Sequence, residues 1–279
     1  RTIELDPAGG CFVGGGSSQY NGVAIGLLVR LNDNGSLDAT YPAGAGPNGE
    51  VRTMLMQPDG KLIIGGTFTS VNGTPRARIA RLLADGSLDI AFDPGSGANG
   101  SVDALALQSD GSILIGGAFT DVNGTPLNRI ARLTSAGAVD ATFLIGTGAN
   151  AGVLGLAIQS DGNILLNGDF TSINGVSRSR IARLNASGGL DATFFPAGTS
   201  GGNIMTMKLL QSGKVLIGGS FLSVGGTSRN RIARLENNGS VDATFDPGMG
   251  VGGWVRAMDE LPDGRILVGG QFTTYAGVW

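Results

Sequence analysis

Residues 58–68 read Pro-Asp-Gly-Lys-Leu-Ile-Ile-Gly-Gly-Thr-Phe, and this stretch decides the fold because the chain repeats it at a fixed interval. Its Asp-Gly pair is typical of a tight turn, and the apolar run after the turn has the length of a buried strand. The diglycine ends that strand at a point where one backbone passes close to another. The stretch therefore predicts a β-hairpin whose second strand ends abruptly.

The interval of the repeat is 51 residues, and it is kept without insertion or deletion. The turn glycine occurs six times, at Gly9, Gly60, Gly111, Gly162, Gly213 and Gly264. An arginine is followed eight residues later by an aspartate in five copies: Arg30 and Asp38, Arg81 and Asp89, Arg132 and Asp140, Arg183 and Asp191, and Arg234 and Asp242. An aromatic residue closes the same five units, at Tyr41, Phe92, Phe143, Phe194 and Phe245. Self-similarity at this period is typical of a repeat architecture.

The second unit contains four extended segments and no helical period. These segments cover residues 51–57, 61–69, 78–83 and 87–92, and tight turns join the first pair and the last pair. Four antiparallel strands repeated in tandem indicate an all-β fold, a β-propeller of four-stranded antiparallel blades. A β-solenoid is the rival interpretation, but its coils are usually shorter and lack two tight hairpins in each unit.

The repeat count predicts a single β-propeller domain over residues 1–279. Its blades cover approximately residues 1–50, 51–101, 102–152, 153–203 and 204–254, and a partial blade covers 255–279. Five full 51-residue repeats and half of a sixth make six blades the preferred number. We expect the chain to be a piece of a longer polypeptide that completes the sixth blade, and the alternative is a sixth blade that is only a two-stranded hairpin.

Composition excludes several classes of function. The chain has 50 glycines among 279 residues, but its 41% hydrophobic content is sufficient for a packed core rather than disorder. A formal net charge of −3 gives no electrostatic case for nucleic acid or an anionic membrane, and no apolar run is long enough for a transmembrane segment. Histidine is absent and Cys11 is the only cysteine, so histidine-dependent catalysis and multi-cysteine zinc sites are excluded. We expect no cofactor and no metal.

Three segments of the second unit resemble the delta-sixty repeat. They are residues 58–68, Arg-Ile-Ala-Arg-Leu at 78–82, and Asp-Gly-Ser-Leu-Asp at 85–89. That family occurs in tandem arrays in large bacterial proteins predicted to be exported, and it is classed as a propeller domain of unknown function. The resemblance implies an exported or cell-surface bacterial protein. It carries over no catalytic residue, because none is established in the family.

The repeated arginine and aspartate allow two interpretations. One is a ring of arginines that binds a ligand. The other is an ion pair within each blade, or an arginine–backbone bond, that fixes the register of the strands. Five nearly identical copies favour the structural interpretation, because a unique binding site usually breaks the symmetry of a repeat.

The connection between the second and third strands holds the candidate binding residues. They are Asn72, Thr74, Arg76, Asn123, Thr125 and Asn174. As ligand-binding residues they would hydrogen-bond a partner, whereas as structural residues the Asn-Gly pairs only supply the positive φ angles of a turn. Both longer connections of each blade emerge on one side, so this loop-rich face is the predicted binding surface.

The sequence favours a non-enzymatic interaction or scaffold module that presents this face to a protein or carbohydrate partner. One alternative is a glycan-active enzyme whose carboxylates, drawn from Glu50, Asp103 and Asp259, converge at the propeller centre. A second alternative is a structural protein that assembles with itself in a surface layer or fibre.

Overall fold

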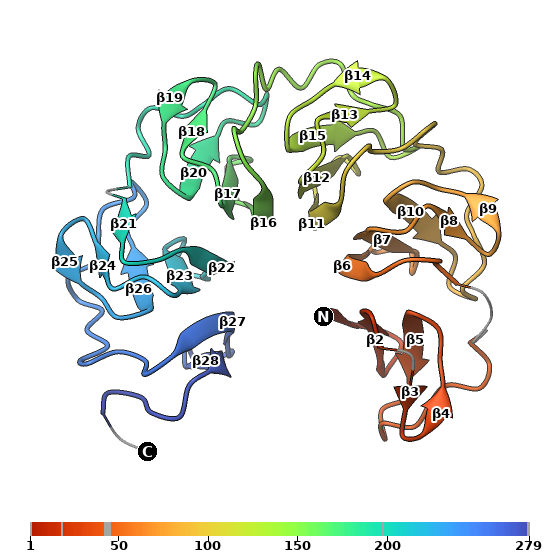
Figure 1. Cartoon of the computed structure of the whole chain (residues 1–279), viewed down its shortest axis with the longest axis horizontal. Coiled ribbons are helices and arrows are strands. Elements are labelled where there is room, and N and C mark those ends of the chain that lie inside the picture. Colours follow the sequence, from red (N-terminus) through yellow and green to blue (C-terminus); the bar gives the residue numbers. More distant parts are fainter. Residues whose placement is uncertain (1, 18, 42–45, 197, 278–279) are drawn as a thin grey trace. The chain divides into compact units, whose positions relative to one another are not determined.

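The structure is a computed structural model that describes residues 2–17, 19–41, 46–196 and 198–277. In these ranges every regular element is a β-strand, as the sequence predicts, and no helix is present that could cross a membrane. The chain divides into two compact units, Arg1–Ala141 and Thr142–Trp279 (Figure 1). A single domain over residues 1–279 stays a prediction.

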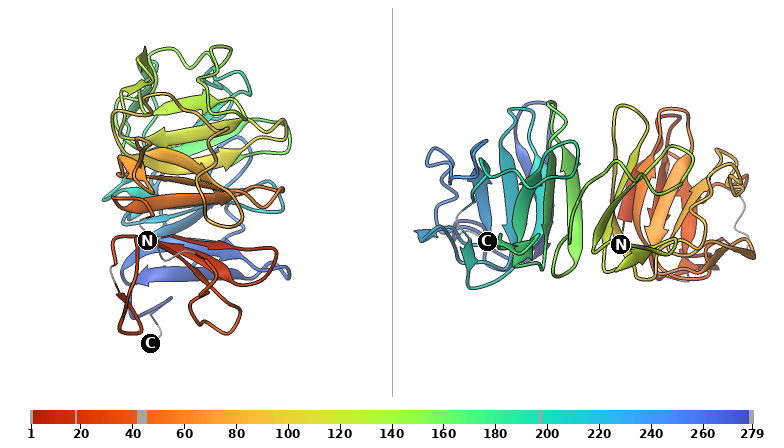
Figure 2. Two further views of the ribbon diagram at one scale, coloured as in Figure 1. Left: turned by 90° about the vertical axis from the view of Figure 1, so that its right-hand side faces the viewer. Right: turned by 90° about the horizontal axis from the view of Figure 1, so that it is seen from above.

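The first unit holds three antiparallel sheets, one for each repeat, and in each sheet the second strand of the repeat lies in the middle. Their strands are β1 (Thr2–Leu5), β2 (Cys11–Gly14) and β5 (Leu28–Leu31) in blade 1; β6 (Val51–Met56), β7 (Leu62–Gly66) and β10 (Ile79–Leu82) in blade 2; and β11 (Val102–Leu107), β12 (Ile113–Gly117) and β15 (Ile130–Leu133) in blade 3. The sheets of this unit lie one above another (Figure 2, left, red to yellow).

The second unit repeats this arrangement twice and adds a hairpin. Its strands are β16 (Val153–Ile158), β17 (Ile164–Gly168) and β20 (Ile181–Leu184) in blade 4; β22 (Ile204–Leu209), β23 (Val215–Gly219) and β26 (Ile232–Leu235) in blade 5; and β27 (Trp254–Glu260) with β28 (Ile266–Gln271) in the final hairpin. Within the described residues β28 pairs with β27 alone, as expected for half of a repeat.

A short second hairpin is inserted between the middle strand and the third strand of each blade. These hairpins are β3 (Gln19–Tyr20) with β4 (Val23–Ala24), β8 (Ser70–Val71) with β9 (Thr74–Pro75), β13 (Asp121–Val122) with β14 (Thr125–Pro126), β18 (Ser172–Ile173) with β19 (Val176–Ser177), and β24 (Ser223–Val224) with β25 (Thr227–Ser228). β21 (Thr199–Ser200) adds a third strand to the last of them. In the first unit they lie on the side of each blade away from its first strand (Figure 1).

The prediction of a fourth full strand in each blade is wrong, because that segment pairs with the third strand at a single position. In blade 2 the bridge joins Leu82 to Leu88. Directly after it, the Asp89 carboxylate accepts a hydrogen bond from the N–H of Ala91, and Phe92 N–H donates to the Asp89 carbonyl at 3.2 Å. These bonds turn the chain, so the ladder ends after one bridge.

The repeated diglycine lets the sheets of one unit stack closely. A Cβ on Gly66 would lie 2.0 Å from the Glu50 carbonyl oxygen, and a Cβ on Gly65 would lie 2.7 Å from Val102 of the next blade. Neither position has room for a side chain. The apolar residues around this contact, including Ile64 and Phe68, are fully buried. Close packing of adjacent blades therefore forms the core of each unit.

Candidate functional site

The repeated arginine lies where two adjacent blades meet. Arg81 Nε donates to Asp89 Oδ2 at 2.8 Å within its own blade, and its Nη1 donates to the Ser135 carbonyl of the next blade at 2.7 Å. The guanidinium carbon also lies 5.0 Å from the centre of the Phe92 ring. Arg81 therefore makes both of the predicted structural contacts: an ion pair within its own blade and a hydrogen bond to the backbone, which here belongs to the next blade.

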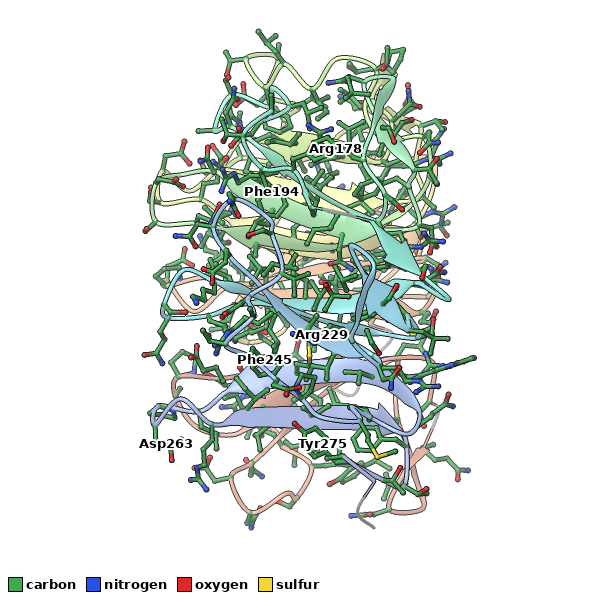
Figure 3. The ribbon with its side chains drawn as sticks, turned by 90° about the vertical axis from the view of Figure 1, so that its left-hand side faces the viewer. Arg178, Phe194, Arg229, Phe245, Asp263 and Tyr275 are labelled. Carbon is green, nitrogen blue, oxygen red and sulfur yellow. The ribbon has the colours of Figure 1, made fainter. Side chains whose placement is uncertain are left out.

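The same arginine–aspartate pair is in contact in all five repeats, and each of these contacts is an arginine joint. The shortest contacts join Arg30 and Asp38, Arg81 and Asp89, Arg132 and Asp140, Arg183 and Asp191, and Arg234 and Asp242. Arg183 repeats the bond between blades, since its Nη1 donates to the Asn237 carbonyl at 2.7 Å. Phe194 and Phe245 close blades 4 and 5. In Figure 3 they lie closer than Arg178 and Arg229 to the left-hand side of unit 2, where Asp263 marks a tight turn.

Hydrogen bonds lower the pKa of the aspartate in the first and the last of these joints. Bonds from the Thr40 hydroxyl, the Thr40 N–H and Arg30 lower the pKa of Asp38 to about 2. The Lys214 ammonium, followed by Thr244 and Arg234, holds the pKa of Asp242 far below its usual range. Asp38 and Asp242 are therefore negatively charged at neutral pH, which fits a structural role for the pair.

The candidate asparagines lie at the tips of the inserted hairpins. Asn72, Asn123 and Asn174 have φ angles of 50°, 50° and 52°, as a tight turn with left-handed residues requires. The Asn123 amide oxygen accepts from the Ser96 N–H at 3.0 Å, and the Asn174 amide oxygen accepts from the Gly148 N–H at 2.9 Å. These two oxygens therefore hold the segment that precedes the blade.

The other candidate residues of the hairpins differ in exposure. Thr74 and Thr125 are exposed. Arg76 is half-buried, and its Nη1 donates to the adjacent Pro75 carbonyl at 3.0 Å. The hairpins therefore offer their second strands to solvent, while the asparagine side chains serve the fold.

The carboxylates of the enzyme alternative are each paired with a cation. Arg52 Nε contacts Glu50 at 2.9 Å, and Arg52 Nη1 contacts Asp103 of the next blade at 2.8 Å. In the other unit Asp259 contacts the Lys208 ammonium at 2.6 Å, which lowers the pKa of Asp259. A general acid in glycoside hydrolysis needs a raised pKa, so Asp259 has the opposite environment.

Two pockets open beside the arginine joints, at the end of the strands where the tight turns lie. In the first unit a pocket of about 470 Å³ lies beside Arg30, between blades 1 and 2. In the second unit a pocket of about 360 Å³ lies beside Arg183, between blades 4 and 5. The sequence predicts a binding surface at the opposite, loop-rich end of the blades and does not predict either pocket. The available signal was a departure from the repeat, because Asp6 and Tyr41 line the first pocket and have no acidic or hydroxyl counterpart in later repeats.

Tandem three-stranded blades with arginine joints define a repeat protein of the β-propeller class. A family comparison matches the chain in six segments, residues 12–41, 57–92, 108–143, 159–194, 210–245 and 261–279, to the family described as domain of unknown function (DUF5122) beta-propeller. Because the segments cover more than half of the sequence, the chain belongs to this family. A search of curated proteins found no match.

Solved structures with a similar fold include a WD40 propeller domain and a protein described as a gluconolactonase. The WD40 beta propeller domain of Doa1 is 18% identical with a TM-score of 0.62, and the match covers 95% of this chain and 73% of that one. XC5397 from Xanthomonas campestris, described as a gluconolactonase, is 13% identical with a TM-score of 0.53, and the match covers 87% of this chain and 75% of that one. At these identities the likeness shows the fold alone.

Proposed function

We propose that this chain is a non-enzymatic interaction module that presents its inserted hairpins to a protein or carbohydrate partner. The observation that carries the proposal recurs in β8–β9, β13–β14, β18–β19 and β24–β25. In each of these hairpins the residue before the turn is buried and both residues after the turn are exposed. The buried residues are Val71, Val122, Ile173 and Val224. An anchored hairpin holds its exposed strand in place before a partner arrives, which lowers the entropic cost of binding.

The exposed strands carry small apolar and hydroxyl side chains without charge. They read Thr74-Pro75, Thr125-Pro126, Val176-Ser177 and Thr227-Ser228. Such residues offer hydrogen bonds and apolar contact at little desolvation cost. The chemistry suits an uncharged polar partner, such as a glycan or an extended peptide.

The connections that lead into the blades are also held in place. The Asn99 amide oxygen accepts from the N–H groups of Thr120 and Asp121, and its amide nitrogen donates to the Thr120 hydroxyl. Asn48 and Asn150 make the same set of bonds in their blades. Rigid support of this kind is typical of surfaces that bind.

The cellular setting is part of the same proposal. Residues 58–68 and 78–82 resemble the delta-sixty repeat, which occurs in bacterial proteins predicted to be exported. We therefore place the module outside the cell or on its surface.

The test begins with a partner found by screening the full chain against a glycan array and a library of displayed peptides. The affinity of the best ligand is then measured for Thr125→Lys in the first unit and Val176→Lys in the second. Burying an unpaired ammonium at the contact weakens binding by at least about tenfold in one of the two variants. Asp263→Lys, at an exposed tight turn, is the matched control and binds as the unaltered chain does.

Two results would contradict the proposal. One is an affinity that both hairpin variants leave unchanged while Asp263→Lys lowers it. The other is turnover of a bound glycan that Asp103→Asn abolishes, which would favour the enzyme alternative.

A further inference from the structure

The pocket between blades 1 and 2 departs from the repeat in the residues that line it. Asp6 stands where blades 2 to 4 have glutamine, Tyr41 where the other blades have phenylalanine, and Phe12 where they have isoleucine or leucine. Three departures at one pocket of about 470 Å³ are what a unique site in a symmetric scaffold requires. A volume of this size is in the range of small-ligand sites.

The described residues that line the pocket carry an excess of negative charge. Asp6, Asp38 and Asp85 face one cation, Arg30, which gives a formal charge of −2. Arg30 Nε donates to Asp6 at 2.9 Å and its Nη1 donates to Asp38, so one guanidinium is shared by two carboxylates. The corresponding pocket of the second unit has one carboxylate, Asp161, and one guanidinium, Arg183, and is neutral.

Asp85 contributes its charge from the neighbouring blade. The Ser87 hydroxyl and N–H donate to one oxygen of its carboxylate, at 2.6 Å and 2.9 Å. These bonds lower the pKa of Asp85 and keep the carboxylate ionised at neutral pH. Its second oxygen accepts no hydrogen bond within the described part of the chain. A negative charge is therefore available at the mouth of the pocket.

Tyr41 contributes a hydroxyl group to the wall of the pocket. Its side chain is 8% exposed, and its ring packs edge-to-face against Phe12 with centroids 5.4 Å apart. Burial, with the nearby charge of Asp85, raises the pKa of the hydroxyl, which therefore keeps its proton. Among the residues that the structure describes, this hydroxyl makes no hydrogen bond. Tyr41 lines the pocket, so its unpaired hydroxyl is available to a polar ligand there.

We propose that this pocket binds an organic cation through a primary ammonium group. The ammonium donates to the carboxylates of Asp85 and Asp6 and to the Tyr41 hydroxyl oxygen. Within the described residues, no three acidic, cysteine or histidine side chains lie close enough together to hold a metal ion. Carboxylates spread around a pocket suit a larger cation that donates several hydrogen bonds. The residues that line this pocket belong to none of the inserted hairpins.

Isothermal titration of the full chain with cadaverine, at low ionic strength, tests the proposal. 1,5-Pentanediol is the uncharged probe of the same length. Asp6→Gln and Tyr41→Phe each introduce the residue that other blades carry, so both variants keep the fold. Asp85→Asn removes one negative charge without changing the shape of the side chain, and Asp161→Asn in the neutral pocket is the matched control.

The unaltered chain binds cadaverine and leaves pentanediol unbound. Asp6→Gln and Asp85→Asn each weaken binding by about tenfold or more, as expected for the loss of a charge-assisted hydrogen bond. Tyr41→Phe weakens it less, and Asp161→Asn has no effect. Equal binding by the diol, binding that survives both Asp6→Gln and Asp85→Asn, equal loss in Asp161→Asn, or no binding at all would overturn the proposal.

Discussion

Arg30 and Arg183 occupy the same position of the repeat, yet they are used differently. Arg183 contacts Asp191 in its own blade and the Asn237 carbonyl in the next, so it fastens two blades of the second unit together. Within the described residues, Arg30 bonds inside blade 1, to Asp6, Asp38 and the Gly9 carbonyl. An arginine that recurs in every repeat supports the fold. A repeat in which the hydrogen-bond partners of this arginine differ, as those of Arg30 do, is the place to look for a function.

Acid is expected to have the largest effect, because the aspartates of four joints have pKa values that are lowered in the folded chain, and acid weakens these joints together. The pKa of Asp38 lies near 2. The pKa of Asp242 is lower still, chiefly because the Lys214 ammonium donates a hydrogen bond to its carboxylate. A carboxylate whose pKa is lower in the folded chain adds stability above its unfolded pKa of about 3.9. That stability is lost as the pH falls from about 4 through about 2.

Urea unfolding followed by circular dichroism at pH 6, 4 and 2.5 measures this loss. The free energy of unfolding falls between the second and third conditions. Burial raises the pKa of Glu4, so protonation of Glu4 acts in the opposite direction at higher pH, as one small contribution. A free energy of unfolding that is unchanged at pH 2.5 would show that the joints add little.

Replacing the two arginines separates their roles. Arg183→Ala leaves the Asp191 carboxylate without its guanidinium and removes the bond to Asn237, which should cost about 3–5 kcal/mol. Arg30→Ala removes a more exposed guanidinium, whose bonds to described residues all lie within its own blade, so about 1–3 kcal/mol is expected. Urea unfolding of both variants makes the measurement.

The matched control for this pair is Arg265→Ala, because the Arg265 side chain is 76% exposed and forms its ion pair with the nearby Asp263. It should change stability by less than about 0.5 kcal/mol. If Arg30→Ala proves as costly as Arg183→Ala, the bond between blades does not distinguish the two joints.

The period of 51 residues located these joints from sequence, because a side chain needed by every blade recurs in every repeat. Asp89 shows where that reasoning stops. Its position in an alternating segment predicts a strand, but its carboxylate accepts a hydrogen bond from the Ala91 N–H and turns the chain. Tyr41 is one of the aromatic residues that close the repeats, and the sequence does not predict that it lines a pocket. Pocket volume depends on side-chain packing between blades, which periodicity does not encode.

A second pair of equivalent positions differs between blades 3 and 4. Blade 3 places Ala104 opposite Gly116, whereas blade 4 places Gly155 opposite Asn167. Asn167 is fully buried, and neither atom of its amide has a hydrogen-bond partner within the described residues. Restoring the blade 3 pair with Gly155→Ala and Asn167→Gly should raise stability by about 1–3 kcal/mol.

Thermal unfolding of this double variant is compared with Gly155→Ala alone. The single change should destabilise, because the new Cβ would lie 2.2 Å from the Asn167 amide oxygen. A double variant less stable than the unaltered chain would mean that the amide has a favourable partner, such as an internal water.

The smallest expected effect on stability belongs to Tyr41→Phe, which makes the first joint resemble that of Arg183. Tyr41 is 8% exposed and its hydroxyl bonds to no described residue, so removal of the hydroxyl should stabilise the chain by about 0.5–1 kcal/mol. Phe194→Tyr is the reverse change at the other joint and should destabilise, since it buries a hydroxyl in a fully buried position.

Both variants are measured by urea unfolding, without and with cadaverine. A polar group kept at a cost to stability is expected where it serves a ligand, so Tyr41→Phe should gain stability and lose affinity together. A loss of stability without cadaverine would mean that the hydroxyl already has a partner in the folded chain. The pocket would then be one more structural joint, and the difference between Arg30 and Arg183 would concern the fold alone.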